Sequence, residues 1–429
     1  MDLRQIEEVI KDTEGGMVEK KETLISNLTN DGKKGIDAGS ALQLFLDHIP
    51  ISSIPGIKNS PVVELNIGDS VRDAIQLLYE KNVYGAPIVD VVDSDGTARR
   101  FSDRYVGFID IASMFLWALE ECEKARMNNF KVVTDEISKT GFFYMLEQNP
   151  QIGQTKVGEL AKSFLMDPFL PVHLDDTLFH VLLLFSKHRL QVVPVTEQPN
   201  SQVIGFITPN AVIQLLLQSS GLDWFDCIAD KFLSEFQFEH EEHNVRVYGD
   251  QSIAEAIDII WNDQIDAIAV VDRGTERAIG CVRSTDIHLL LDNDSLFHNR
   301  KNLNVEEFIH FDASKTDSDP TIKRDLGALL SAGVLRLRNS FIPRMVSPVT
   351  NKKTETLKEA MRKLAETKSN FSFLVDELQQ VKGVVKLRDI IIQFAPPCID
   401  SRIDGGGFFE SALEQTGCHV ENGTVICDH

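Results

Sequence analysis

The chain has 429 residues, of which 43% are hydrophobic and 25% charged, and its formal net charge is −22. This composition is typical of a globular protein of about two to three domains and excludes fibrous and disordered classes. Its apolar runs are far shorter than the roughly 20 residues of a membrane span, so we expect no membrane association. Its negative charge repels nucleic-acid phosphates, so we expect no nucleic-acid partner. The N-terminus has no apolar signal core, so we expect a cytoplasmic protein. Localisation to the nucleus is the alternative.

The first segments come before any repeat. Residues 1–40 are polar and are predicted to form a mobile tail. Ala41–Ile49 has the pattern of a short amphipathic helix, closed by Pro50 and Pro55.

Four later segments carry apolar residues at positions i, i+3, i+4 and i+7, which places an apolar stripe on one helix face. A hydroxyl residue directly precedes each stripe and can accept hydrogen bonds from the free N–H groups of the first helical turn. We therefore predict four amphipathic helices with hydroxyl N-caps. The caps and stripes are Ser70 before Val71, Ala74, Ile75 and Leu78; Thr177 before Leu178, Val181, Leu182 and Phe185; Ser252 before Ile253, Ala256, Ile257 and Ile260; and Thr356 before Leu357, Ala360, Met361 and Leu364.

The segments after the four predicted helices share a pattern as well. A β-rich run starts at the sixteenth residue, counted from the first stripe residue: Ala86–Asp90, Val193–Thr196, Ile268–Asp272 and Ser372–Asp376. A glycine then opens a second strand, at Gly107, Gly205, Gly280 and Gly383. Second helices are predicted over Ile111–Leu119, Ala211–Leu217, Asp286–Leu291 and Asp389–Phe394. Since one such unit has a small core, we expect the four copies to pair face to face and bury their sheets.

The segments between the repeats complete the predicted organisation. Cys122–Lys139 is polar and is predicted to be a loop or frayed helix, and Leu303–Gly333 combines a helix around Glu306–Phe311 with an acidic loop. The predicted divisions are a tail (1–40), helix and linker (41–61), repeat 1 (62–125), linker (126–155), repeat 2 (156–220), repeat 3 (221–293), linker with helix (294–340), repeat 4 (341–396) and tail (397–429).

The repeat pattern is similar to CBS (cystathionine-β-synthase) domains, and the four-copy arrangement resembles the plant-type gamma regulatory subunit of AMP-activated and sucrose-non-fermenting-type protein kinases. The resemblance covers most of residues 41–394. It rests on the segments Phe45–Pro55, Ala86–Asp90, Asp103–Phe108, Thr155–Val157, Pro168–Leu170 and Gly221–Phe225. It implies an α/β (α+β) fold in which strand-helix-strand-strand-helix repeats pair into two modules of a flattened disc. It also implies a non-catalytic regulator whose partners are kinase catalytic (alpha) and scaffolding (beta) subunits, with AMP, ADP or ATP as regulatory ligands.

In that family an aspartate six residues after the second-strand glycine contacts the ribose, and a serine or threonine stands three residues before it. Here the aspartate positions hold Ser113, Ala211, Asp286 and Asp389. The hydroxyl positions hold Asp110, Thr208, Arg283 and Lys386. The resemblance thus gives five candidate nucleotide-binding residues: Asp286, Asp389, Thr208, Arg283 and Lys386.

Each candidate also has a second interpretation. Asp286 and Asp389 directly precede apolar helices, where an aspartate commonly caps the helix. Arg283 and Lys386 either block the hydroxyl position or supply a phosphate contact. The family's phosphate-binding His-Arg positions hold Gln191-Val192 and Asn370-Phe371, with Lys187, His188 and Arg189 nearby at a helix end.

Three other groups of residues are candidates for binding or metal sites, and none of them is predicted to form one. Arg336, Arg338 and Arg344 are interpreted as a solvent or partner face. His240 and His243 lack further metal ligands nearby, and the six cysteines are expected to be reduced thiols. The alternative to a kinase subunit is a free-standing CBS protein that binds adenylate-type metabolites or other protein partners.

Overall fold

We describe the chain from a computed structural model over residues 38–54, 57, 62–90, 104–128, 141–160, 166–197, 202–238, 246–311, 335–338, 345–395, 418–421 and 424–427. The predicted tail up to residue 37, the charged loop 93–103, the acidic loop 312–320, both histidines near residue 240 and most of the C-terminal tail lie outside these residues. Ala38–Ser40, predicted to belong to the tail, instead begin helix α2 (Ala38–Asp47).

Each repeat contains a short strand, a helix, two longer strands and a second helix. The short strand runs parallel to the middle strand, which pairs antiparallel with the last one. Repeat 1 consists of β1 (Leu65–Asn66), α3 (Val71–Glu80), β2 (Gly85–Val89), β3 (Tyr105–Asp110) and α4 (Ile111–Asn128). Repeat 2 consists of β5 (Val172–His173), α8 (Leu178–Lys187), β6 (Val193–Glu197), β7 (Gln202–Ile207) and α9 (Pro209–Leu217).

The other two repeats have the same order of elements. Repeat 3 consists of β8 (Arg246–Tyr248), α11 (Ile253–Asn262), β9 (Ala267–Val271), β10 (Ala278–Arg283), the 3-10 turn η6 (Ser284–Ile287) and α12 (His288–Asp292). Repeat 4 consists of β11 (Thr350–Lys352), α16 (Leu357–Thr367), β12 (Phe371–Val375), β13 (Val381–Lys386) and α17 (Leu387–Phe394).

Further elements lie between the repeats or at the chain end. They are η1 (Ile51–Ser53), α5 (Phe142–Gln148), α6 (Pro150–Gly153), α7 (Val157–Leu160), β4 (Asp167–Pro168), α10 (Asp223–Ala229), η5 (Leu233–Glu235), α13 (Asp294–Asn299), α14 (Val305–Ile309) and the hairpin β14 (Cys418–Glu421) with β15 (Thr424–Cys427).

The four predicted helices start where the hydroxyl residues indicated, and three of the four caps are confirmed. Ser70, Ser252 and Thr356 each accept a hydrogen bond from the backbone N–H three residues later, at 3.1–3.2 Å. Thr177 makes no capping bond, and its hydroxyl donates to Asp47 of α2 at 3.2 Å.

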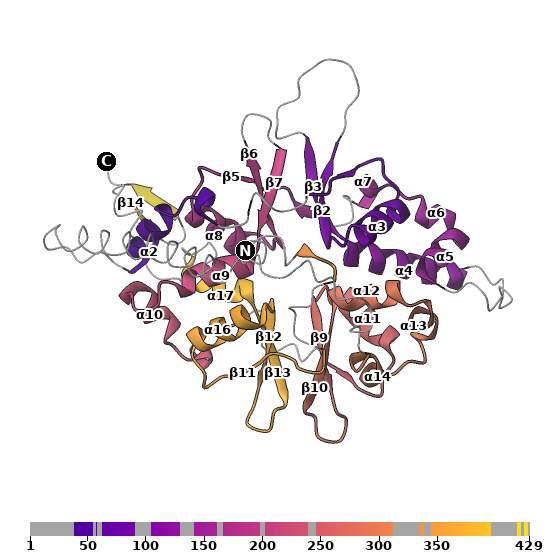
Figure 1. Cartoon of the computed structure of the whole chain (residues 1–429). Helices are drawn as coiled ribbons and strands as arrows, with labels where there is room; N and C mark the ends of the chain where they lie inside the picture. Colours follow the sequence, from indigo (N-terminus) through magenta and orange to yellow (C-terminus); the bar gives the residue numbers. More distant parts are fainter. Residues whose placement is uncertain are drawn as a thin grey trace, which may run out of the picture.

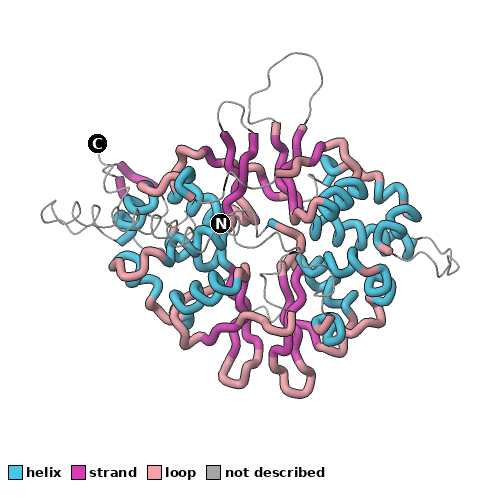
Figure 2. The backbone as a smooth tube through the Cα atoms, viewed as in Figure 1, coloured by secondary structure: helices cyan, strands magenta, loops and turns pink. Residues whose placement is uncertain are grey.

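The repeats form a flattened disc, as Figures 1 and 2 show, with sheets toward the middle and helices on two outer flanks. The sheets of repeats 1 and 2 share a core that includes Phe108 and Phe206, whose ring centroids are 5.7 Å apart. The sheets of repeats 3 and 4 pack through another core that includes Ala269 and Phe373. The helices pair differently, with repeats 1 and 3 on one flank and repeats 2 and 4 on the other. The predicted fold of two modules with buried sheets is therefore confirmed.

The repeated glycine lies inside the second strand rather than at its start, which corrects the prediction. A Cβ atom at Gly107 would lie 2.7 Å from the carbonyl oxygen of Asp167, in the segment that leads into repeat 2. A Cβ atom at Gly205 would lie 2.1 Å from the carbonyl oxygen of Ile57, in the segment that leads into repeat 1. Within this module, each entering segment therefore crosses the partner repeat's strand at a point where a side chain has no room.

Two second helices also differ from their predicted extent. Helix α4 continues to Asn128, although a loop or frayed helix was predicted from Cys122 onward. Cys122 is buried, so the start of this polar stretch still carries a core position. In repeat 3, the predicted helix begins as a 3-10 turn. No helix in the described ranges is long and apolar enough to cross a membrane.

Candidate functional site

The four strand-to-helix junctions face the middle of the disc. Figure 1 shows the turns from β9 to β10 and from β12 to β13 at the rim, and the C-terminal ends of β3, β7, β10 and β13 toward the centre. The residues three and six positions after the glycine stand at the N-cap and third position of the turn or helix that follows. The pairs are Asp110 with Ser113, Thr208 with Ala211, Arg283 with Asp286, and Lys386 with Asp389.

In repeats 1 and 2 the first residue of the pair caps the helix. Asp110 accepts hydrogen bonds from the Ser113 backbone N–H at 2.8 Å and from the Ser113 hydroxyl at 2.7 Å. Thr208 accepts a hydrogen bond from the Ala211 backbone N–H at 3.3 Å. Asp110 and Thr208 are both buried, at 3% and 2% exposure. Their side chains therefore have a structural role that needs no ligand.

In repeat 3 the second residue of the pair makes the capping bond and also an ion pair. Asp286 accepts a hydrogen bond from the Arg283 backbone N–H at 2.8 Å. The Arg283 guanidinium donates through Nη2 to Oδ1 at 2.8 Å and through Nε to Oδ2 at 3.0 Å. Burial alone lowers the pKa of Arg283, but the Asp286 carboxylate outweighs it and holds that pKa above its ordinary value. Both carboxylate oxygens of Asp286 are thus engaged by Arg283.

Repeat 4 has a different arrangement although its sequence is similar. Asp389 accepts a hydrogen bond from the Lys386 backbone N–H at 2.8 Å, as in repeat 3. The Lys386 ammonium group instead pairs with Asp266 of repeat 3, at 3.2 Å. Asp266 is 62% exposed and Lys386 25% exposed, so this pair is accessible to solvent. Lys386 therefore links repeats 3 and 4 across the inner side of their module.

Carboxylates gather at the inner junction of repeats 1 and 2. Gln191 donates from its side chain to Asp110 at 3.0 Å and from its backbone N–H to Asp167 at 2.8 Å. Burial raises the pKa of Asp167 to about 7, and Asp110 and Asp266 contribute to the rise, although the Gln191 N–H opposes the shift. Burial also raises the pKa of Asp110. This junction disfavours a further negative charge, and hence disfavours a phosphate group there.

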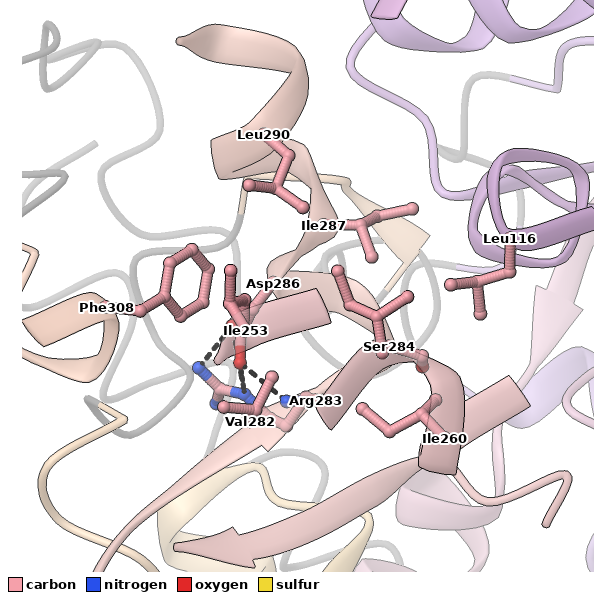
Figure 3. A pocket seen from close by; sticks show the side chains of 11 residues that line it. Leu116, Ile253, Ile260, Val282, Arg283, Ser284, Asp286, Ile287, Leu290 and Phe308 are labelled. Carbon is pink, nitrogen blue, oxygen red and sulfur yellow. Dashed lines mark hydrogen bonds and ion pairs between the residues drawn. The ribbon is translucent and has the colours of Figure 1, made fainter. Parts of the chain in front are cut away.

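Figure 3 shows a small cavity beside the Arg283–Asp286 pair. Apart from Ser284, its other lining residues are apolar and include Ile253 and Leu290 of repeat 3 and Leu116 of repeat 1. The cavity has a volume of about 10 Å³. That is room for about one water molecule, so an adenine nucleotide does not fit there in this conformation.

The structure places all five predicted site residues at these junctions and brings two pairs into contact, Arg283 with Asp286 and Lys386 with Asp389. Lys187 ends α8, and His188 is its C-cap residue, as expected for cations at a helix end. The sequence did not single out Asp167 or Asp266, because their neighbours come from other repeats. In the described part of the chain, no group of three or more His, Cys, Asp or Glu residues is placed to hold a metal ion.

Comparisons with known proteins agree with this architecture. A family profile for the CBS domain matches residues 157–218, within repeat 2. The SNF1-related protein kinase regulatory subunit gamma-1 of Arabidopsis thaliana is 24% identical over 386 residues, which cover 86% of this chain and 86% of that protein. The gamma-1-like protein of the same plant is 24% identical over 318 residues, covering 61% of this chain and 70% of that protein.

Among solved structures, protein MJ1225 of Methanocaldococcus jannaschii aligns with a TM-score of 0.51 and 15% identity, covering 81% of this chain and 100% of that chain. This likeness shows a shared fold. Together with the two plant relatives, it confirms the resemblance that the sequence segments predicted.

Proposed function

We propose that this four-repeat CBS protein, a relative of the plant SNF1-related kinase gamma subunits, is the non-catalytic gamma-like subunit of a kinase complex. The observation that carries the proposal is a similarity to the gamma-1 subunit that extends over 86% of both chains, well beyond the repeat that the CBS profile matches. A relative that shared only a CBS repeat would match over a short stretch. The partners we propose are a kinase catalytic subunit and a scaffolding beta subunit.

The direct test is co-purification. The chain, carrying an affinity tag, is co-expressed with the kinase catalytic and beta subunits of its own organism, and the eluate is analysed for both. Retention of both subunits at equal stoichiometry supports the proposal. Failure of the folded chain to retain either subunit overturns it and favours the free-standing CBS protein.

We further propose that any response to adenine nucleotides is confined to repeat 4. In repeat 3, Arg283 engages both oxygens of Asp286 and occupies the position where the family has a small hydroxyl residue. In repeat 4, the Lys386 ammonium group pairs with Asp266 of repeat 3. The carboxylates of repeats 1 and 2 disfavour phosphate at their own junction.

Calorimetry with AMP, ADP and ATP tests this assignment. Asp389→Ala abolishes binding if Asp389 contacts the ribose, whereas Asp286→Ala leaves binding unchanged. Each variant loses one capping carboxylate at the same helix position, but Asp286→Ala also loses the ion pair with Arg283, so its folding is checked by circular dichroism before the comparison. Unchanged binding by Asp389→Ala assigns this residue to capping alone.

A further inference from the structure

The segment Leu335–Arg338, which we call the strap, packs against residues of repeats 1 and 3 that are distant from it in the sequence. Leu335 is 8% exposed and lies in the core between the sheets of repeats 1 and 2. Leu337 is 2% exposed and lies in the core between the helices of repeats 1 and 3. Four consecutive residues therefore contribute to two separate cores.

The strap backbone pairs with the residues that lead into β2. The Tyr84 N–H donates to the Leu335 carbonyl at 2.6 Å, and the Leu337 N–H donates to the Asn82 carbonyl at 3.3 Å. The Arg338 N–H donates to Oδ1 of Asn82 at 2.8 Å. Asn82 has a φ of 53°, in the left-handed region that asparagine tolerates better than most residues. The strap thus pairs antiparallel with repeat 1, and the addition of an extended segment to a strand is a common mode of peptide recognition.

The side chain of Arg338 contacts repeats 1 and 3 at the same time. Its guanidinium lies 4.6 Å from the ring centroid of Tyr79 and forms an ion pair with Asp292 through Nε and Nη2. The Tyr79 hydroxyl also donates to Asp292, at 2.7 Å. Burial alone raises the pKa of Asp292, but the hydrogen bonds from Arg338 and Tyr79 hold it below its ordinary value. Stacking combined with a forked ion pair selects arginine over lysine.

Arg338, interpreted from the sequence as part of a solvent or partner face, is 39% exposed and also makes these internal contacts; Arg344 lies outside the described residues. In the strap, two buried leucines alternate with another residue and are followed by an arginine that contacts an acidic and an aromatic side chain. This is the pattern of a bound extended peptide.

We propose that repeats 1 and 3 form a groove for an extended Leu-X-Leu-Arg segment, and that the strap is its exchangeable internal occupant. Because the strap is tethered to the same chain, its effective concentration at the groove is high. A partner segment with the same pattern displaces it only by competing with this tethered copy. The strap therefore controls access to the inner edge of repeat 1, where Tyr84 is half-buried near Asp110.

Supplying the strap in trans tests the proposal. In a Leu335→Asp/Leu337→Asp variant the occupant no longer fits, so a fluorescent peptide spanning residues 333–340 binds, as measured by anisotropy. The wild-type chain binds the peptide at least about tenfold more weakly, because its own strap competes. The same peptide with Arg338→Gln binds the variant roughly tenfold more weakly, since it lacks both the ion pair and the ring contact. Equal peptide binding by both chains, or no binding by the folded variant, overturns the proposal.

A second measurement does not depend on the folding of that variant. Asp292→Asn weakens the Arg338 anchor while both strap leucines are kept. Hydrogen exchange at the Tyr84 amide then accelerates, by about tenfold if the ion pair and ring contact contribute as such pairs usually do. Amides of helix α8, in the other flank of the disc, are the internal control. Unchanged protection of the Tyr84 amide shows that the strap is not released and contradicts the proposal.

Discussion

Replacing Asp167 by asparagine changes stability in a way that depends on pH. Asp167 lies in β4, next to the sheet of repeat 1, and accepts the Gln191 N–H at 2.8 Å. Burial, followed by the charges of Asp110 and Asp266, raises its pKa from 3.8 to about 7. An asparagine keeps a carbonyl oxygen that accepts the same hydrogen bond but carries no charge. Its shape is also nearly unchanged, so the substitution isolates the cost of the buried charge.

The size of the effect can be worked out from linkage. A carboxyl group whose folded pKa is raised binds its proton more tightly in the folded state, so the folded state loses stability as pH rises from about 4 to 7. A shift from 3.8 to about 7 corresponds to roughly 4 kcal/mol at about pH 8 and roughly 2 kcal/mol at about pH 5. We therefore expect Asp167→Asn to raise the free energy of unfolding, and to raise it by roughly 2–3 kcal/mol more at pH 8 than at pH 5.

Urea unfolding followed by circular dichroism at pH 5 and pH 8 measures this difference. Asp272→Asn is the control, because hydrogen bonds from Thr275 hold the pKa of Asp272 below its ordinary value of 3.8. Asp272 is ionised at both pH values, so its substitution has the same effect at each. A stabilisation by Asp167→Asn that is equal at pH 5 and pH 8, or a loss of stability at pH 8, refutes the argument.

Three further substitutions test the packing and the capping contacts by the same unfolding measurement. Gly205→Ala places a Cβ atom 2.1 Å from a linker carbonyl and should cost roughly 1–3 kcal/mol, whereas Gly68→Ala meets nothing within 4 Å and should not show this cost. Arg283→Met leaves Asp286 buried without its cation and should cost roughly 3–5 kcal/mol; adding Asp286→Asn should recover most of that loss. Thr356→Ala removes the cap of α16 and should cost about 1 kcal/mol, and a loss near zero would show that the cap is unimportant.

The sequence predicted those parts of the fold that depend on neighbouring residues. The helix stripes and β-rich runs recur in each repeat, and they correctly place α3, α8, α11 and α16 together with the strands that come after them. The glycines were recognised as a shared signal, but the reason for them was not, because the crossing segment that excludes a side chain comes from the partner repeat.

The candidate site was less predictable, because its chemistry depends on contacts between distant residues. Arg283 and Lys386 occupy the same repeat position, yet one pairs with the aspartate of its own turn and the other with Asp266 of a different repeat. The forked guanidinium of Arg283 suits a two-point pair with the carboxylate of its own turn, but nothing in the local sequence indicates that Lys386 reaches Asp266. Asp110 and Gln191 are 81 positions apart in the chain, so their hydrogen bond could not be inferred from spacing either. The strap, Leu335–Arg338, is too short for any periodicity to be detected.

The mass of the assembled complex most directly tests the proposal that this chain is a kinase subunit. The chain is co-expressed with the catalytic and beta subunits of its own organism and analysed by size-exclusion chromatography with light scattering. We expect one species whose mass equals the sum of one copy of each subunit. A chain that elutes alone, separate from a complex of the other two subunits, would contradict it.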